Sequence, residues 1–149
     1  MVKAGGGSDM GTARGVKTRN NKQWTEARYR GFIRSALRGA WQRWGPNHEV
    51  KKTARVERGK YRCAGYNRRS HIVTASITVE GKRKNNIFTD HIVPVGGDGD
   101  WNEIIENLFC EVDNLQLLCK SCHDVKTKDE RHDSRTRARI KAYGDTTKT

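Results

Sequence analysis

Between Thr25 and Trp44, apolar side chains recur every three or four residues, which predicts an amphipathic helix. The apolar stripe, which we expect to pack on the core, consists of Tyr29, Ile33, Ala36, Leu37, Ala40, Trp41 and Trp44. Thr25 is a suitable N-cap, and Gly45-Pro46 is expected to end the helix. The basic stretch His48–Lys60 favours at most a short helix.

The middle of the chain has the composition of β-strands. Residues 71–79 are β-branched and partly alternate between apolar and polar side chains, which predicts one strand. Glu80-Gly81-Lys82 suits a turn, and Ile87-Phe88-Thr89 begins a second strand that runs into Asp90-His91. A third strand is predicted over 114–118.

Two further helices are expected. A loop that precedes the first of them contains Pro94, Gly96, Gly97 and Gly99. Asp100 and Glu103 have the spacing of a capping box, which marks a helix start. The apolar face of this helix, expected in the core, comprises Trp101, Ile104, Ile105, Leu108 and Phe109. After residues 119–123, a long polar helix is predicted to run to about Tyr143 and to end at Gly144.

Composition limits the size and the environment of the fold. The 149 residues and 17.0 kDa suffice for one domain with one modest core. Only 34% of the residues are hydrophobic, and no apolar run reaches ten residues, so we expect no membrane span. The first residues lack the apolar segment of a secretory signal, which leads us to expect a cytoplasmic protein.

Positive charge is concentrated in the N-terminal part. The formal net charge is +13, and residues 1–60 carry fifteen Lys/Arg against four Asp/Glu. Such an excess favours a polyanionic partner, above all nucleic acid. We expect a flexible basic tail over 1–23, a basic amphipathic helical arm over 24–58, a folded domain over 59–143 and a short tail over 144–149. The arm presents five arginines to phosphate groups: Arg28, Arg30, Arg34, Arg38 and Arg43.

Cysteine spacing indicates a structural zinc site. Cys119-x-x-Cys122 allows two thiolates to share one tetrahedral ion, and Cys63 is a third ligand by position. A second cysteine would be expected three residues after Cys63, but Tyr66 stands there. The fourth ligand is either His71 or Cys110; His71 is preferred, because Cys110 ends an apolar helix and suits a small buried hydrophobe. Reduced thiols that bind no metal are the alternative.

A second group of polar residues carries a family resemblance. Asp90-His91 ends a strand before the glycine-rich loop, Asn114 begins the next strand, and His123 directly follows the CxxC pair. In this order the sequence resembles the HNH, or ββα-metal, nucleases, and most of all the small HNH proteins of bacteriophages. The resemblance covers about residues 60–130. The matching stretches are Thr89–Pro94, Asp113–His123 and Lys126-Thr127.

The resemblance implies an α+β fold with a small ββα-metal core and a zinc-knuckle-like element. It also assigns roles. His91 would be the general base, since imidazole is substantially neutral near pH 7 and can accept a proton. Asp90 and His123 would bind one catalytic divalent ion, Mg²⁺ or Mn²⁺, although imidazole also admits Ni²⁺ or Zn²⁺. Asn114 would orient the loop that carries the base. Some family members have another histidine at the position of Thr127, which is therefore assigned no ligand role here.

The expected activity is that of an endonuclease hydrolysing phosphodiester bonds, most simply nicking double-stranded DNA to leave a 5′-phosphate and a 3′-hydroxyl. Phage origin, and with it the bacterial host cytoplasm, rests on the resemblance alone. A homodimer or a phage protein partner is compatible with this activity.

Other interpretations stay open. His91 could be a strand-end histidine bonded to the backbone, and His123 could bind the structural zinc beside Cys122. The chain would then be a non-catalytic, zinc-containing module that binds nucleic acid. A third possibility is an HNH nuclease acting on single-stranded or structured DNA, or on RNA.

Overall fold

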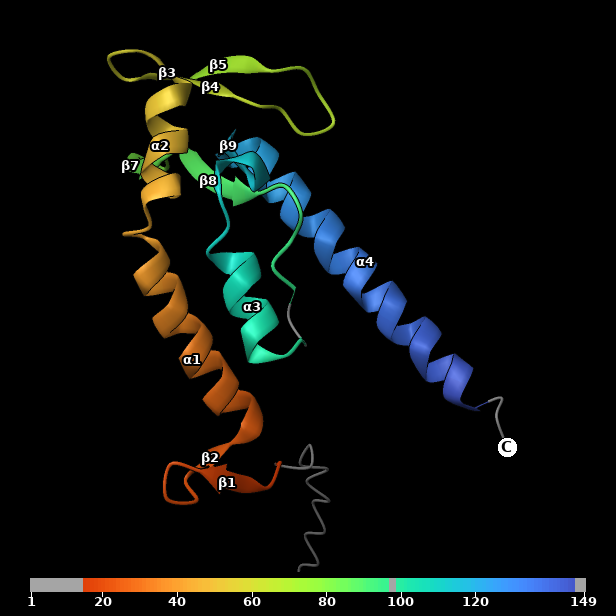
Figure 1. Ribbon diagram of the computed structural model, residues 1–149. Helices are drawn as coiled ribbons and strands as arrows, with labels where there is room; N and C mark the ends of the chain where they lie inside the picture. Colours follow the sequence, from red (N-terminus) through yellow and green to blue (C-terminus); the bar gives the residue numbers. More distant parts are fainter. Residues whose placement is uncertain (1–14, 97–98, 147–149) are drawn as a thin grey trace, which may run out of the picture. The chain divides into compact units, whose positions relative to one another are not determined.

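The computed structural model describes residues 15–96 and 99–146, with side chains up to 137 (Figure 1). The fold is mixed α and β, as predicted: these residues form four α-helices and small antiparallel sheets. Most of the predicted flexible tail, residues 1–14, lies outside them, as do Gly97 and residues 147–149. The chain divides after Gly39 into two compact units, which we describe separately.

The first unit contains a short hairpin and most of the first helix. Strand β1 (Lys17–Arg19) pairs antiparallel with β2 (Trp24–Thr25), although residues up to 23 were expected to be flexible. Helix α1 (Glu26–Trp41) follows, and Thr25 caps it as predicted, because its Oγ1 accepts a hydrogen bond from the Arg28 backbone N–H at 3.2 Å. Arg19 donates to Glu26 at 2.8 Å and so ties the hairpin to the helix.

In the second unit, Gly45-Pro46 lies between two helices: α1 ends before it, and a second helix begins at Gly45. Helix α2 (Gly45–Ala54) has the proline in its first turn, where the missing N–H costs nothing. The short helix expected after residue 48 is therefore real, but it ends at Ala54. Strand β3 (Arg55–Glu57) then pairs with β4 (Lys60–Cys63), which pairs with β5 (His71–Thr74) in one antiparallel sheet.

The single strand predicted over 71–79 was wrong, because the chain changes sheets at Ala75. The Ala75 backbone N–H donates to the Gly59 carbonyl, and its carbonyl accepts from Asn86, so its two sides have different partners. Beyond it, β6 (Ser76–Val79) pairs with β7 (Lys82–Asn85). The predicted turn is present: Glu80 and Gly81 have φ of 50° and 74°, as a two-residue hairpin loop requires.

The remaining elements form the centre of the second unit. Strands β8 (Ile87–His91) and β9 (Leu115–Cys119) pair antiparallel and lie side by side in Figure 1. Between them in sequence come helix α3 (Trp101–Leu108) and a 3₁₀ turn, η1 (Val112–Asn114). Helix α4 (Lys120–Thr146) follows β9 without a loop. The core consists mainly of Cys63, Ile87, Ile104, Leu108, Leu115, Leu117, Leu118, Cys119 and Cys122.

Three details of these elements differ from the predictions. Asp100 is the N-cap residue of α3, but its side chain makes no capping hydrogen bond, so the capping box with Glu103 is not formed. Asn114 ends η1, and the strand begins one residue later. Helix α4 continues past Gly144, because a glycine can end a helix but need not do so. Within the described residues, no helix is long and apolar enough to cross a membrane.

Candidate functional site

Three cysteines and one histidine from different elements converge in the second unit. Cys63 ends β4, His71 begins the paired strand β5, Cys119 ends β9, and Cys122 lies in the first turn of α4. Their ligand atoms all lie within 4.8 Å of one another. The three cysteines are buried, so the sulfurs face each other in a closed site. Three sulfurs and one imidazole are a donor set typical of structural zinc.

Hydrogen bonds around these four residues, the Cys₃His cluster, orient their donor atoms. The Cys63 sulfur accepts from the backbone N–H of Gly65 at 3.4 Å and of Cys119 at 3.2 Å. His71 Nδ1 is 3.0 Å from the Arg69 carbonyl, which can only accept, so Nδ1 carries the proton. The lone pair of His71 Nε2 therefore faces the cluster, 3.6 Å from the Cys119 sulfur. The cluster fits a metal such as zinc, which would be held by three thiolates and Nε2.

The two cysteines of the CxxC pair differ in acidity. Burial raises the pKa of the Cys119 thiol, but hydrogen bonds, the largest of them from the Cys122 backbone N–H, outweigh burial and lower it to about 7. Burial also raises the pKa of Cys122, and the neighbouring sulfurs bring it to about 11. Cys119 is thus the readier of the two to supply the thiolate that a metal requires.

The structure decides between the two candidates for the fourth ligand. His71 belongs to the cluster and Cys110 does not. The Cys110 carbonyl instead accepts a hydrogen bond from Trp44 Nε1 at 2.9 Å, and burial raises the pKa of the Cys110 thiol. Tyr66, which occupies the position where a second cysteine was expected, has contacts of its own. Tyr66 packs against the cluster, and its hydroxyl donates to Asp129 Oδ2 on α4 at 3.0 Å.

The loop between the first two cluster residues depends on one glycine. Gly65 has φ of +82°, a conformation that favours glycine. A Cβ atom there would lie 2.3 Å from the Arg68 carbonyl oxygen. The tight turn brings the Gly65 N–H to the Cys63 sulfur, so the conformation of this loop helps to orient a ligand of the cluster.

A second polar cluster lies where β8 meets the start of α4. Asp90 Oδ1 is 4.0 Å from His123 Nε2, and these side chains are 14% and 33% exposed. Two ligand atoms about 2.0–2.2 Å from one ion lie about 3 Å apart when adjacent and about 4 Å apart when opposite, so this separation fits one ion with the two atoms on opposite sides of it. The other carboxylate oxygen, Oδ2, accepts from Gln116 Nε2 at 3.2 Å. The His123 ring stacks on Phe88, with ring centres 5.0 Å apart.

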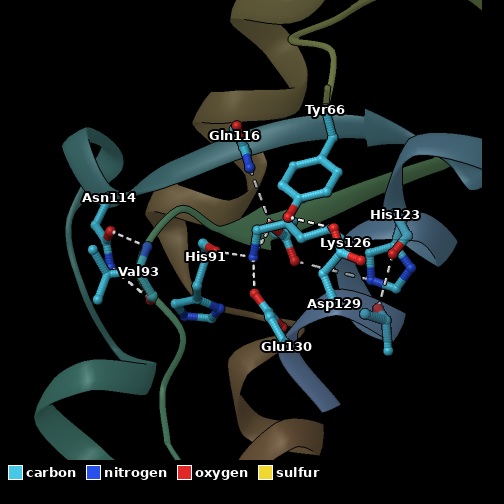
Figure 2. A network of polar contacts seen from close by, with 11 residues as sticks. Tyr66, His91, Val93, Asn114, Gln116, His123, Lys126, Asp129 and Glu130 are labelled. Carbon is cyan, nitrogen blue, oxygen red and sulfur yellow. Dashed lines mark hydrogen bonds and ion pairs between the residues drawn. The ribbon is translucent and has the colours of Figure 1, made fainter. Parts of the chain in front are cut away.

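Lys126 also contacts Asp90. The family resemblance includes this lysine in a matching stretch, but the sequence analysis gave it no role. Its side chain is 7% exposed, and its ammonium group lies 3.0 Å from Asp90 Oδ2. The same group donates to the His91 carbonyl at 2.9 Å and to the Glu130 carboxylate (Figure 2). Burial lowers the pKa of Lys126, but the two carboxylates raise it above its usual value, so the lysine stays charged. In the sequence, the four-residue spacing between Lys126 and Glu130 could have indicated an ion pair on one face of a helix.

One ring nitrogen of His91 makes a hydrogen bond to the backbone. His91 Nε2 is 2.9 Å from the Leu108 carbonyl at the end of α3, and this carbonyl can only accept a hydrogen bond. Nε2 therefore carries the proton in the neutral ring, which leaves Nδ1 as the acceptor. The ring also packs on Trp41, with ring centres 5.1 Å apart. If His91 had only a structural role, its ring would be expected to bond to the backbone, and this bond is present. The same bond leaves Nδ1 as a hydrogen-bond acceptor.

Asn114 links the two strands to the loop after His91. Its Oδ1 accepts from the Val93 N–H at 2.9 Å and its Nδ2 donates to the Val93 carbonyl at 3.4 Å (Figure 2). Its own backbone carbonyl accepts from the Ile92 N–H. Asn114 thereby joins η1 to the loop that follows His91. The hydroxyl of Thr127 donates to the His123 carbonyl at 2.8 Å and so is engaged within α4.

The remaining predicted site residues are the arginines. Arg28, Arg38 and Arg43 are exposed, whereas Arg30 and Arg34 are half-buried. The Arg28 guanidinium lies over the Trp24 ring, 4.7 Å from its centre, which leaves its edge able to reach phosphate.

No protein-family model, curated protein or solved structure matches this chain.

Proposed function

We propose that the chain is a metal-dependent HNH endonuclease that hydrolyses DNA phosphodiester bonds. One observation carries the proposal: Asp90 and His123 face each other at 4.0 Å, and His91, the next residue of the strand after Asp90, keeps one ring nitrogen as a hydrogen-bond acceptor. These are the residues to which the HNH resemblance assigns the metal ligands and the base. The element order β8, β9, α4 is also the strand–strand–helix order which that resemblance implies.

His91 supplies the base. The hydrogen bond to the Leu108 carbonyl fixes the tautomer with the proton on Nε2, so Nδ1 can take a proton from a water molecule. The water oxygen then forms a bond to phosphorus while the bond from phosphorus to the 3′ oxygen breaks, and the 3′ oxygen takes up a proton from solvent. The products are a 5′-phosphate and a 3′-hydroxyl.

Asp90 and His123 hold the catalytic ion, which we take to be Mg²⁺ or Mn²⁺. With only two protein ligands, most of the coordination shell is left for water and phosphate oxygens. An ion bound there would stabilise negative charge on the phosphate and on the departing 3′ oxygen. Gln116 and Lys126 both bind Asp90 Oδ2, so Oδ1 remains available beside His123 Nε2.

DNA is the substrate that the charge favours. The net charge of +13 lies mainly before residue 60, where the exposed arginines of the helical arm can contact phosphates without reading sequence. One active site in one chain would cut one strand at each encounter, so the primary product is a nick.

A supercoiled plasmid tests the proposal. With Mg²⁺ or Mn²⁺, the wild-type protein should convert supercoiled plasmid into relaxed circles, and linear DNA should appear only later. The conversion is followed by gel electrophoresis over time. Linear DNA appearing together with the first relaxed circles would contradict single-strand nicking. Tight DNA binding without cleavage under either metal would instead favour the non-catalytic, zinc-containing module.

Lys126 should position Asp90 for this reaction. The change Lys126→Met removes a buried ammonium that binds both Asp90 and the His91 carbonyl, so we expect nicking to slow by about 10–100-fold, the usual effect of losing a residue that orients a metal ligand. The rate is measured as a function of Mn²⁺ concentration.

Lys128→Met is the matched control, because Lys128 is exposed two residues further along the same helix. It should nick like the wild type. Thermal unfolding of both variants separates lost activity from lost folding. An unchanged rate in Lys126→Met would mean that Gln116 alone is enough to orient Asp90.

A further inference from the structure

A concave surface lies beside the Cys₃His cluster, and His71 and Cys119 form part of its lining. It has a volume of about 470 Å³ and is formed by the loop before β5, by β5 and β6, and by the start of α4. Its lining includes Arg68, Ile77, Asn86, Lys120 and Asp124. The sequence patterns assigned no function to these residues.

The β6–β7 hairpin extends this concavity with positive charge. Strand register pairs Ile77 with Lys84 and Val79 with Lys82. Directly paired residues project from the same face of a sheet, so Lys82 and Lys84 share the face of Ile77, which lines the concavity. All four residues of β7 are exposed. The hairpin is thus a two-stranded ribbon with lysines along one side.

The charge of this surface is not neutralised within the described residues. Lys120 and Asp124 form an ion pair at 2.7 Å, so together they add no net charge. Arg68, Lys82 and Lys84 have no carboxylate partner in the described part of the chain, and all three are exposed. Arg68 lines the concavity, and Lys82 and Lys84 lie on the face of the hairpin that Ile77 contributes to it. We call the concavity and this face of the hairpin together the basic groove.

We propose that the basic groove binds the phosphate backbone of duplex DNA next to the cleaved bond. This inference rests on the proposed function for the identity of the partner. The cations are spread from the loop before β5 to the hairpin, which suits a chain of phosphates better than one small anion. Lys84 precedes Asp90 by six residues and so lies no more than about 21 Å from it, or about six base pairs of duplex. One bound duplex can therefore reach both sites.

The test removes the three charges and measures duplex binding. The variant with Arg68→Gln, Lys82→Gln and Lys84→Gln is compared with a control carrying Lys128→Gln, Arg131→Gln and Arg135→Gln, three exposed cations of α4 that lie outside both the groove and the arm. Fluorescence anisotropy gives the affinity at several salt concentrations, without added Mg²⁺ or Mn²⁺. If each of the three cations contacts one phosphate, the slope of log K against log salt should fall by about 2.7 in the groove variant.

Each outcome decides the matter. A clearly larger fall in slope for the groove variant than for the control supports the basic groove. Equal falls, or none, would overturn it, because only the overall charge would then matter; so would a wild-type protein that does not bind duplex DNA. Plasmid nicking is measured separately. A wild type that binds through the groove and does not cut would end the nuclease proposal and leave the groove standing.

Discussion

The change His91→Ala should reduce plasmid nicking by about 10²–10⁴-fold, the usual contribution of a general base. In the structure, His91 Nε2 is committed to the Leu108 carbonyl, and only Nδ1 can accept the proton of the attacking water. Affinity for duplex DNA should not change, because His91 is not among the cations proposed to bind phosphate. The initial rate of nicking and the anisotropy of labelled duplex check the two halves of this prediction.

His132→Ala is the matched control for His91→Ala. His132 lies on α4, and its side chain is 82% exposed. It should nick at the wild-type rate. Because His91 packs on Trp41, the alanine variant is also examined by thermal unfolding. Added imidazole should partly restore nicking if the base alone is missing. A folded His91→Ala protein that nicks normally would remove His91 from the mechanism.

The second large effect concerns the Cys₃His cluster. Cys119→Ser removes a buried sulfur that lies among Cys63, His71 and Cys122, and it should abolish stoichiometric zinc binding. Structural zinc sites supply free energy of folding directly, because the unfolded chain has no preformed site. A loss of about 5 kcal/mol lowers the Tm of a domain of 60–100 residues by about 20–40 °C. Metal content by mass spectrometry and thermal unfolding by circular dichroism measure both effects.

Cys110→Ser provides the control, because Cys110 is the cysteine outside the cluster. It should keep one zinc per chain and nearly the wild-type Tm. Equal zinc content in Cys119→Ser and wild type would show that the cluster consists of reduced thiols without metal. Substitution is preferred to a chelator in the nicking assay, since a chelator would remove both the structural and the catalytic ion.

Local patterns in the sequence predicted those features that depend on a single helix or turn. The helix over 101–108 follows from its apolar spacing, and the turn at Glu80-Gly81 follows from its residue types. The break at Ala75 could not be predicted this way. Six of the nine residues 71–79 are β-branched, and the change of sheet depends on backbone hydrogen bonds between Ala75 and two residues outside that segment, Gly59 and Asn86.

The candidate sites divide in the same manner. The sequence by itself determined that two cysteines three residues apart sit at a strand–helix junction, and that Asp90 and His91 end a strand, because short spacings are set by covalent geometry. Only the tertiary structure decided that His71 rather than Cys110 completes the cluster, and that Lys126 is buried against Asp90. Both depend on pairing between distant strands and on the packing of α4, and such long-range contacts leave no periodic trace in the local sequence.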